Sequence, residues 1–445
     1  MHSANPIAAA WMARLQIMTG IRKPEREARF IVDAIICALR AVVRPTVLLL
    51  LGTSLAAACW PARAQPGGPL RLRAESAISY ESNVLRLADD ISAASAAGLL
   101  RGRGKGAFVT SLGAGARADI SLSRQRFRAD VSATRNQYLD FDELDYTGYA
   151  ARGAWDWRVG NDWHGELSAG TRQERRASSS AVGVLVPRLQ QLHDALVDAR
   201  YALTPRWELQ ASANVLEVDN REPAFRTEDF EQRAVSLGAL YRTPRRNGVG
   251  ARLRYESGEW PGRPPASVAL FGNDYTQYTV SALVDWRVTA RSRIHGDAGY
   301  TSRQRGAAVS RDFDGPTGRL TYEHTLTGRI ALRGTLYETR GAADNVTATY
   351  VKVTGLHLAA TYRASAKISL EATAGVHELD YLGDSLVPGL EQRRDEITTL
   401  GLASTYRATR TLTFSAGTQY DQRSSNAPLG DYHIYTVFLR AGIEI

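Results

Sequence analysis

The stretch GYAARGAWDWRV, residues 148–159, alternates between two kinds of side chain. One set of alternate positions is apolar and aromatic: Tyr149, Ala151, Gly153, Trp155, Trp157 and Val159. The other set, which includes Arg152, Asp156 and Arg158, is largely charged. Because successive side chains of a β-strand point to opposite faces of the sheet, this pattern predicts a strand with one apolar and one polar face.

A short motif recurs along the chain: an aromatic residue, an Arg or Leu, a short polar turn, and then renewed alternation. Its copies are TYRATRTLTFSAG from Thr405, TYRASAKISLEATAG from Thr361, DWRVTARSRIHGDAG from Asp285, RYALTPRWELQASAN from Arg200 and LYRTPRRNGVGARLR from Leu240. The recurrence predicts one repeated unit, in which two strands are joined by a tight turn. After Gln65 no segment shows sustained helical periodicity, and no apolar run approaches the length of a membrane-spanning helix.

The alternating segments add up to about 18 predicted strands. They lie near residues 71–83, 107–120, 125–138, 146–159, 162–174, 193–203, 207–219, 231–242, 248–258, 275–288, 292–303, 316–326, 329–339, 348–362, 367–379, 396–407, 411–422 and 432–445. Short connections such as 160–161 alternate with long ones such as 84–106. Short periplasmic turns, long extracellular loops and an even strand number are typical of a transmembrane β-barrel with both chain ends in the periplasm.

A soluble β-sandwich is the alternative, because its strands also alternate. A sandwich, however, buries the large aliphatic side chains of two sheets against each other. Here the apolar positions are rich in Ala, Gly, Leu and Val, and Tyr and Trp gather near the strand ends. We therefore predict an all-β fold, a transmembrane antiparallel up-and-down barrel in the cell outer membrane, with outer-membrane lipid around it.

The N-terminal region predicts a cleaved signal peptide. The apolar run TVLLLLGTSLAAA at 46–58 follows two arginines and precedes an A-x-A pattern that ends at Ala64. We expect cleavage after Ala64, so that 1–64 is leader and signal peptide and 65–445 is the barrel. A membrane anchor is the alternative, although the run is shorter than the roughly 20 residues that a spanning helix needs.

Charge and motif content exclude several functions. Without the predicted leader the chain keeps 47 basic and 43 acidic residues, a net charge of +4 instead of +9, so we expect no nucleic-acid partner. Both cysteines lie in the leader, and no H-E-x-x-H, G-x-S-x-G or phosphate-loop motif occurs. The pairs His164/Glu166 and His295/Asp297 are interpreted as polar lining of a wet interior. We expect no cofactor, no metal and no enzymatic activity.

The polar positions of the predicted strands supply the candidate functional residues. In a barrel they line the lumen, where charged groups set the selectivity of a channel and Arg binds carboxylates or sugar hydroxyls. The alternative is that they pair across strands and hold the wall together. The candidates are Arg152, Arg158, Glu166, Arg172, Asp198, Arg200, Arg252, Arg254, Asp285, Arg287, Arg293, Arg333 and Arg440.

The end of the first predicted strand carries a family resemblance. It reads YESNVLRL at 80–87, and the segments SRQRF at 123–127 and YLDFDELDY at 138–146 extend the likeness. Together they resemble a family of outer-membrane β-barrel porins, most closely the EpsL-type proteins associated with exosortase-linked exopolysaccharide gene clusters. The matching motif residues are Tyr80, Asn83, Arg86 and Leu87.

The resemblance implies a part in exopolysaccharide biosynthesis or export, with a glycan passing through or near a charged lumen. Polysaccharide and periplasmic export proteins are then the expected partners. Two alternatives remain open at this point: a general porin for small solutes, and an occluded barrel that scaffolds an export complex through loops such as 181–191.

Overall fold

The computed structural model describes residues 69–176, 188–306, 312–345, 348–383 and 391–445. Its strands are β1 (Leu70–Glu81), β2 (Ala107–Leu122), β3 (Gln125–Tyr138), β4 (Tyr146–Val159), β5 (Trp163–Arg176), β6 (Arg188–Ala202), β7 (Trp207–Asn220), β8 (Phe230–Arg242), β9 (Gly248–Glu259), β10 (Asp274–Thr289), β11 (Ser292–Arg305), β12 (Phe313–Thr325), β13 (Ile330–Asn345), β14 (Ala348–Arg363), β15 (Ile368–Leu382), β16 (Arg394–Arg407), β17 (Leu412–Ser425) and β18 (Tyr432–Glu444). Short helical segments in the connections are α4 (Ala93–Leu100), η1 (Asp142–Leu144), η2 (Pro223–Glu228) and α5 (Pro265–Phe271). None of the helices in these ranges has both the length and the apolarity to cross a membrane.

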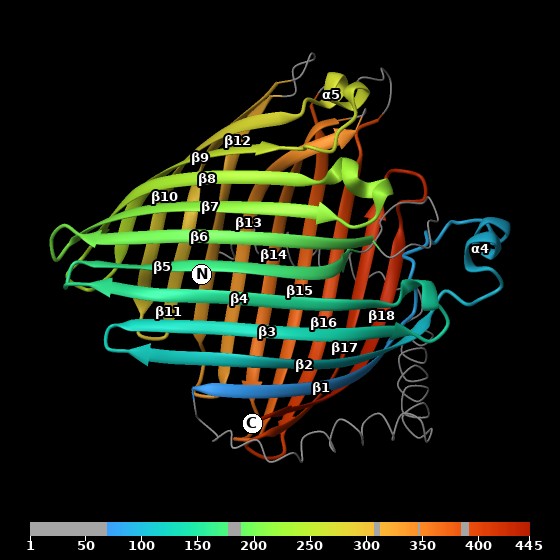
Figure 1. Cartoon of the computed structure of the whole chain (residues 1–445), viewed down its shortest axis with the longest axis horizontal. Helices are drawn as coiled ribbons and strands as arrows, with labels where there is room; N and C mark the ends of the chain where they lie inside the picture. The colour runs from blue at the N-terminus through green and yellow to red at the C-terminus, as the bar shows by residue number, and fades with distance from the viewer. Residues whose placement is uncertain (1–68, 177–187, 307–311, 346–347, 384–390) are drawn as a thin grey trace, which may run out of the picture. The chain divides into compact units, whose positions relative to one another are not determined.

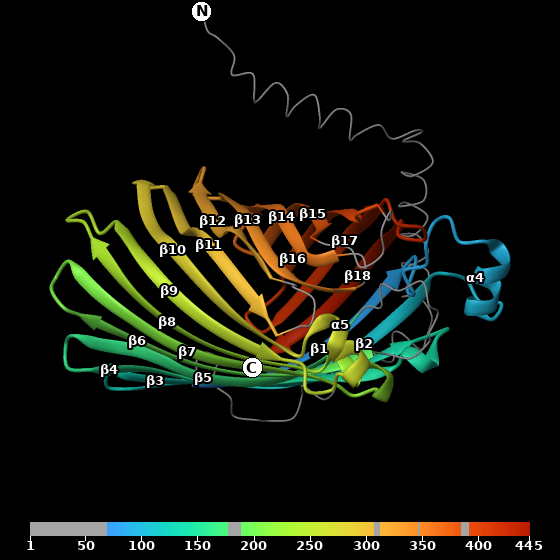
Figure 2. The same ribbon diagram turned by 90° about the horizontal axis from the view of Figure 1, so that it is seen from above.

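The eighteen strands form one closed antiparallel sheet (Figures 1 and 2). Each strand pairs with its neighbours in sequence, and β1 also pairs with β18, from Arg73 opposite Glu444 to Glu81 opposite Thr436. Closure removes the free sheet edges, so the backbone of every strand is hydrogen-bonded by its neighbours, as lipid requires. The predicted 18-stranded up-and-down barrel is confirmed.

The pairing register keeps the two kinds of side chain on opposite faces. Trp155 of β4 lies opposite Phe127 of β3, and in the next row Asp156 lies opposite Arg126. Because paired residues of antiparallel strands share a face, apolar rows and polar rows alternate around the barrel. The period-two pattern of the sequence thus becomes one apolar surface and one polar surface.

Exposed aromatic rings mark both borders of the apolar surface. Those near the short connections, each at least 39% exposed, are Phe127, Trp155, Trp163, Trp207, Trp286, Tyr322, Tyr362, Tyr406 and Phe414. Those nearer the long connections include Tyr255, Tyr278 and Tyr300. So large an exposed apolar belt is stable in lipid, with aromatic girdles at the two interfaces. The barrel therefore lies in the cell outer membrane, and its polar face lines the interior.

Hydroxyl groups hold several of the short turns, which lie at what we call the turn end of the barrel. The Oγ1 of Thr204 accepts hydrogen bonds from the backbone N–H groups of Arg206 (3.2 Å) and Trp207 (3.0 Å). The same pair of bonds, at 2.9–3.2 Å, is made by Thr327, Ser365 and Thr409. Ser and Thr favour such turns because the hydroxyl takes the place of a backbone acceptor. The recurring motif of the sequence is therefore a turn closed by a Ser or Thr.

Several strands are longer than predicted at the opposite end, which carries α4 and α5 and is called the loop end (Figure 1). β13 runs to Asn345 instead of 339, so only 346–347 separate it from β14, and the strict alternation of short and long connections is wrong at this point. Here the outer face becomes charged, as in the pair Glu338–Arg340 at 3.0 Å, because strand pairing continues past the lipid. The predicted leader, 1–64, lies outside the described residues. Of the predicted binding loop, 181–191, residues 181–187 also lie outside them, and residues 188–191 belong to β6.

Candidate functional site: the charged inner wall

The candidate site is the polar inner face of the barrel. The register places all the predicted lumen-lining residues on this face: Arg152, Arg158, Glu166, Arg172, Asp198, Arg200, Arg252, Arg254, Asp285, Arg287, Arg293, Arg333 and Arg440. They come from β4, β5, β6, β9, β10, β11, β13 and β18. Whether any of them binds a solute stays a prediction.

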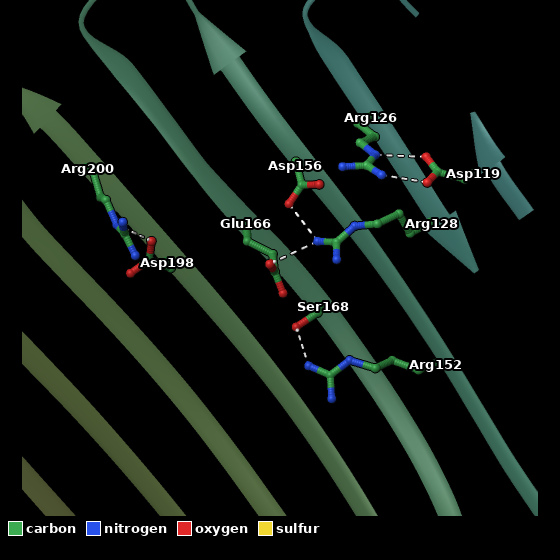
Figure 3. A network of polar contacts seen from close by, with 9 residues as sticks. All are labelled: Asp119, Arg126, Arg128, Arg152, Asp156, Glu166, Ser168, Asp198 and Arg200. Carbon is green, nitrogen blue, oxygen red and sulfur yellow. Dashed lines mark hydrogen bonds and ion pairs between the residues drawn. The ribbon is translucent and has the colours of Figure 1, made fainter. Parts of the chain in front are cut away.

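Three carboxylates lie side by side on the inner face and are called the acid row. Asp156 of β4 is opposite Glu166 of β5, which is opposite Asp198 of β6. Like charges directly opposite each other destabilise a sheet, so the row needs cations. Arg128 donates through Nη2 to Asp156 (2.7 Å) and Glu166 (3.1 Å), and Arg200 donates through Nε to Asp198 (2.9 Å), as Figure 3 shows.

Further arginines lie next to the acid row. Arg126 of β3, directly opposite Asp156, donates two hydrogen bonds of 2.8 and 2.6 Å to Asp119 (Figure 3). Towards the loop end, Arg152 donates to Ser168 Oγ at 3.3 Å and lies 3.6 Å from a carboxylate oxygen of Asp194. The Arg152 side chain is 55% exposed, and a guanidinium has five N–H donors. The guanidinium therefore has more donors than these two contacts use, and the remaining ones are available to water or a solute.

Arginine–carboxylate pairs also line the inner face on strands β9 to β13. They are Arg252–Asp297 (3.4 Å), Arg254–Glu256 (3.0 Å), Arg293–Asp285 (2.7 Å) and Arg333–Glu323 (3.0 Å). Arg172 lies 3.4 Å from Glu174. Within the described ranges, Arg158, Arg287 and Arg440 form no ion pair. Most predicted residues thus take part in ion pairs, some across strands and some within one strand, and a few arginines keep an unmatched charge among the residues described.

Threonine hydroxyls form a neutral stretch of the same wall, on β10 to β13. Thr301 lies 2.9 Å from Thr279 and 2.8 Å from Thr317, oxygen to oxygen, and Thr321 lies 3.2 Å from Thr335. A hydroxyl both donates and accepts, so this stretch offers hydrogen bonds without charge. The interior therefore combines charged and neutral polar surfaces.

Three residues that pair with charged groups of the inner wall were missed by the sequence prediction: Arg128, Asp119 and Asp194. Each lies at one of the alternate positions of its strand that face the interior. In the segment QRFRAD, the alternation of Arg126, Arg128 and Asp130 is the signal that indicates the first of them. The contact from Arg128 on β3 to Glu166 on β5 passes over β4, and no pairwise strand pattern reveals such a reach.

The motif residues of the family resemblance form a tight exit from β1. Asn83 is buried, donates to the Leu87 carbonyl (2.8 Å) and accepts from the Leu87 N–H (2.8 Å). Arg86, inside this closed loop, has a left-handed backbone with φ 52°. The Tyr80 ring lies 5.0 Å from the ring of Phe108. The motif therefore fixes how the chain leaves the barrel wall.

Two of the three segments that carry the resemblance, 80–87 and 138–146, meet in one apolar group at the loop end, the loop cluster. Its members are Val84, Leu87, Leu100, Ala107, Val109, Tyr138, Phe141 and Leu144. Arg103 grips Glu143 with bonds of 2.6 and 3.1 Å and lies 4.2 Å from the Phe141 ring. This hydrogen-bonded guanidinium holds the pKa of the Glu143 carboxyl below its usual range. The segments thus have a structural role in the extramembrane loops.

No protein-family model and no curated protein matches the sequence, so nothing in these comparisons supports the EpsL-type resemblance. Among solved structures, the chain is similar to OpdK of Pseudomonas aeruginosa with vanillate (TM-score 0.46, 11% identity, 84% of this chain and 99% of that chain). It is also similar to OccK2 (OpdF) of Pseudomonas aeruginosa in complex with glucuronate (0.45, 13%, 85% and 98%) and to OccAB3 of Acinetobacter baumannii (0.44, 11%, 84% and 99%). With TM-scores this low, the architecture of this chain rests on its own strand pairing, which makes it a closed 18-stranded outer-membrane barrel.

Proposed function

We propose that the protein is a porin, an outer-membrane channel through which small hydrophilic solutes pass. The observation that carries this proposal is the exposure of the acid row and its arginines to the interior. The exposed fractions of these side chains are 37% for Asp156, 31% for Glu166, 40% for Arg128 and 43% for Arg200. A dry interior would have to compensate each of these charges fully, whereas water in a lumen solvates them.

Charges of both signs and neutral hydroxyls suit weak contacts with many solutes. A channel must bind a solute well enough to admit it and loosely enough to release it. The inner wall supports this because most of its arginines in the described ranges are already paired with carboxylates, so that much of its positive charge is balanced. The solute is therefore expected to exchange hydrogen bonds along the wall and to stop at no one site.

Conductance of the purified barrel in planar bilayers tests the proposal. The wild-type protein should open channels, and Arg152→Ala should shift the reversal potential in a salt gradient towards cations, because Asp194 loses its cation. Arg233→Ala is the matched control, since Arg233 lies on the outer face, 3.3 Å from Glu231, with 72% of its side chain exposed. A barrel that never conducts would contradict the proposal and favour the occluded scaffold.

Exopolysaccharide export is the second candidate, supported by the resemblance at 80–87 and 138–146. Both segments contribute to the loop cluster, and this candidate adds polysaccharide and periplasmic export proteins as partners. A glycan channel should be blocked by its own polymer, and loss of the gene should change the amount or location of surface polysaccharide. A current that ignores added polymer, with unchanged surface polysaccharide in the deletion strain, would leave the small-solute porin alone.

A further inference from the structure

Two histidines meet on the inner wall. His357 of β14 lies opposite Gly375, and His377 of β15 lies opposite Gly355. The two imidazoles therefore take diagonal positions on neighbouring strands and share the polar face. Long side chains at such positions reach each other.

The two glycines leave open the space into which the rings turn. A Cβ on Gly375 would lie 3.4 Å from Nε2 of His377 and 3.6 Å from Cδ2 of His357. The edges of both rings thus converge on one point above this glycine. A Cβ on Gly355 would lie 2.8 Å from Nδ1 of His377, closer than such atoms approach in proteins, so only glycine lets the ring sit there.

A tyrosine orients one of the two rings. The hydroxyl of Tyr337 on β13 lies 2.5 Å from Nδ1 of His377, and the guanidinium carbon of Arg319 lies 4.9 Å from the centre of the Tyr337 ring. When Nδ1 donates its proton to the tyrosine oxygen, Nε2 keeps a free lone pair. The Nε2 atom itself lies beside the space above Gly375. Hydrogen bonds of this kind fix the tautomer and orientation of metal-binding histidines.

We propose that His357 and His377 form a binding site for a divalent late transition-metal ion on the inner wall, with Tyr337 as a positioning residue. Neutral imidazole suits copper, nickel and zinc, of which Cu²⁺ binds most strongly. Metal–nitrogen distances in such sites are about 2.0–2.1 Å, so a ring nitrogen of His357 must turn towards the space above Gly375, where its Cδ2 now lies. No group of three or more His, Cys, Asp or Glu that could hold a metal occurs in the described residues, so water completes the coordination.

Titration of the refolded full chain with Cu²⁺, followed by electron paramagnetic resonance, tests the site. The wild-type protein should bind one Cu²⁺ saturably, with a spectrum that shows nitrogen ligands. His357→Ala and His377→Ala should each weaken binding at least tenfold. Tyr337→Phe should weaken it about tenfold, the loss expected for removal of an outer hydrogen-bond partner. Heat-modifiable migration on gels verifies that each variant has folded as a barrel.

His164→Ala is the matched control, because His164 lies on the same inner face but on β5. It should bind Cu²⁺ like the wild type. Absence of saturable binding in the wild type, or binding that survives loss of either His357 or His377, overturns the proposal. The readout is equilibrium binding, so it does not depend on whether the barrel conducts.

Discussion

Removal of Arg128 should unbalance the acid row in a measurable way. The substitution Arg128→Gln keeps a long polar side chain but withdraws the cation that binds Asp156 at 2.7 Å and Glu166 at 3.1 Å. The Cβ atoms of directly opposite residues are about 5 Å apart, and two like charges at that separation repel by roughly 0.8 kcal/mol in water and roughly 3 kcal/mol at an effective dielectric of 20. Because both are about a third exposed (37% and 31%), screening favours the lower value, about 1 kcal/mol.

Two assays measure this change. The urea midpoint of barrel unfolding should fall by the equivalent of about 1 kcal/mol, and the reversal potential in a salt gradient should move towards cations, since about 1 kcal/mol corresponds to roughly fivefold in local ion concentration. Adding Asp156→Asn should reverse most of both effects, because one fewer carboxylate then needs a partner. This double-mutant cycle isolates the electrostatic term from the loss of side-chain packing.

Arg128 does not balance the acid row if Arg128→Gln leaves both the urea midpoint and the reversal potential unchanged. The same conclusion follows if Asp156→Asn adds to the damage, since the acid row would then be held by something other than Arg128. Arg233→Gln on the outer face serves as control, because it removes an arginine from the same barrel without touching the interior.

Two further predictions concern the loops. Asn83→Ala should loosen the exit from β1 by roughly 1–3 kcal/mol, the cost of leaving buried backbone groups unpaired, and hydrogen exchange over 82–106 should detect it, with Asn83→Asp less affected. The pKa of Glu143 is lowered from its ordinary value of 4.5, so its bond to Arg103 stabilises the loop cluster fully at pH values above 4.5 and is lost as the pH falls through the lowered pKa. A spin label on α4 should become more mobile as the pH falls through this range. Glu143→Gln should abolish this pH-dependent change in mobility.

The barrel itself was predictable because its signal is local. About ten residues of alternating polarity, as in GYAARGAWDWRV, are enough to predict a strand. Closure of the sheet follows because every strand must be paired in lipid. The strand ends were less predictable. Beyond the lipid, the outward positions carry charged residues such as Glu338 and Arg340 instead of apolar ones. The alternation of apolar and polar residues therefore ends before the strand does, and backbone pairing continues to Asn345.

The turn motif was recognised from its aromatic residue, but the group that closes the turn is the hydroxyl of its Ser or Thr. Tyr406 is exposed on the outer face near the turn, and Thr409 closes the turn with bonds to the N–H groups of residues 411 and 412. The two features recur together because they serve different needs at the same place. The aromatic ring meets the membrane interface, and the hydroxyl satisfies the backbone where the chain reverses.

The sequence predicted which residues face the interior, but it did not predict their ion-pair partners. Which carboxylate meets which arginine depends on the register between strands and on contacts that skip a strand, as Arg128 does when it reaches Glu166 from β3 to β5. A one-residue slip of any pair would turn every side chain of that strand to the other face. The acid row therefore exists only after β3 to β6 have paired in one register.

That dependence makes the two interpretations of the inner wall compatible. Ion pairs that hold the wall together also set the field that a solute meets, because the same guanidinium that grips a carboxylate with some of its donors presents the rest to the interior. Arg152 is the clearest case, with contacts to Ser168 and Asp194 and more than half of its side chain exposed. A substitution that only weakened the wall would lower stability and leave selectivity unchanged, whereas an inner arginine with both roles must change the two together.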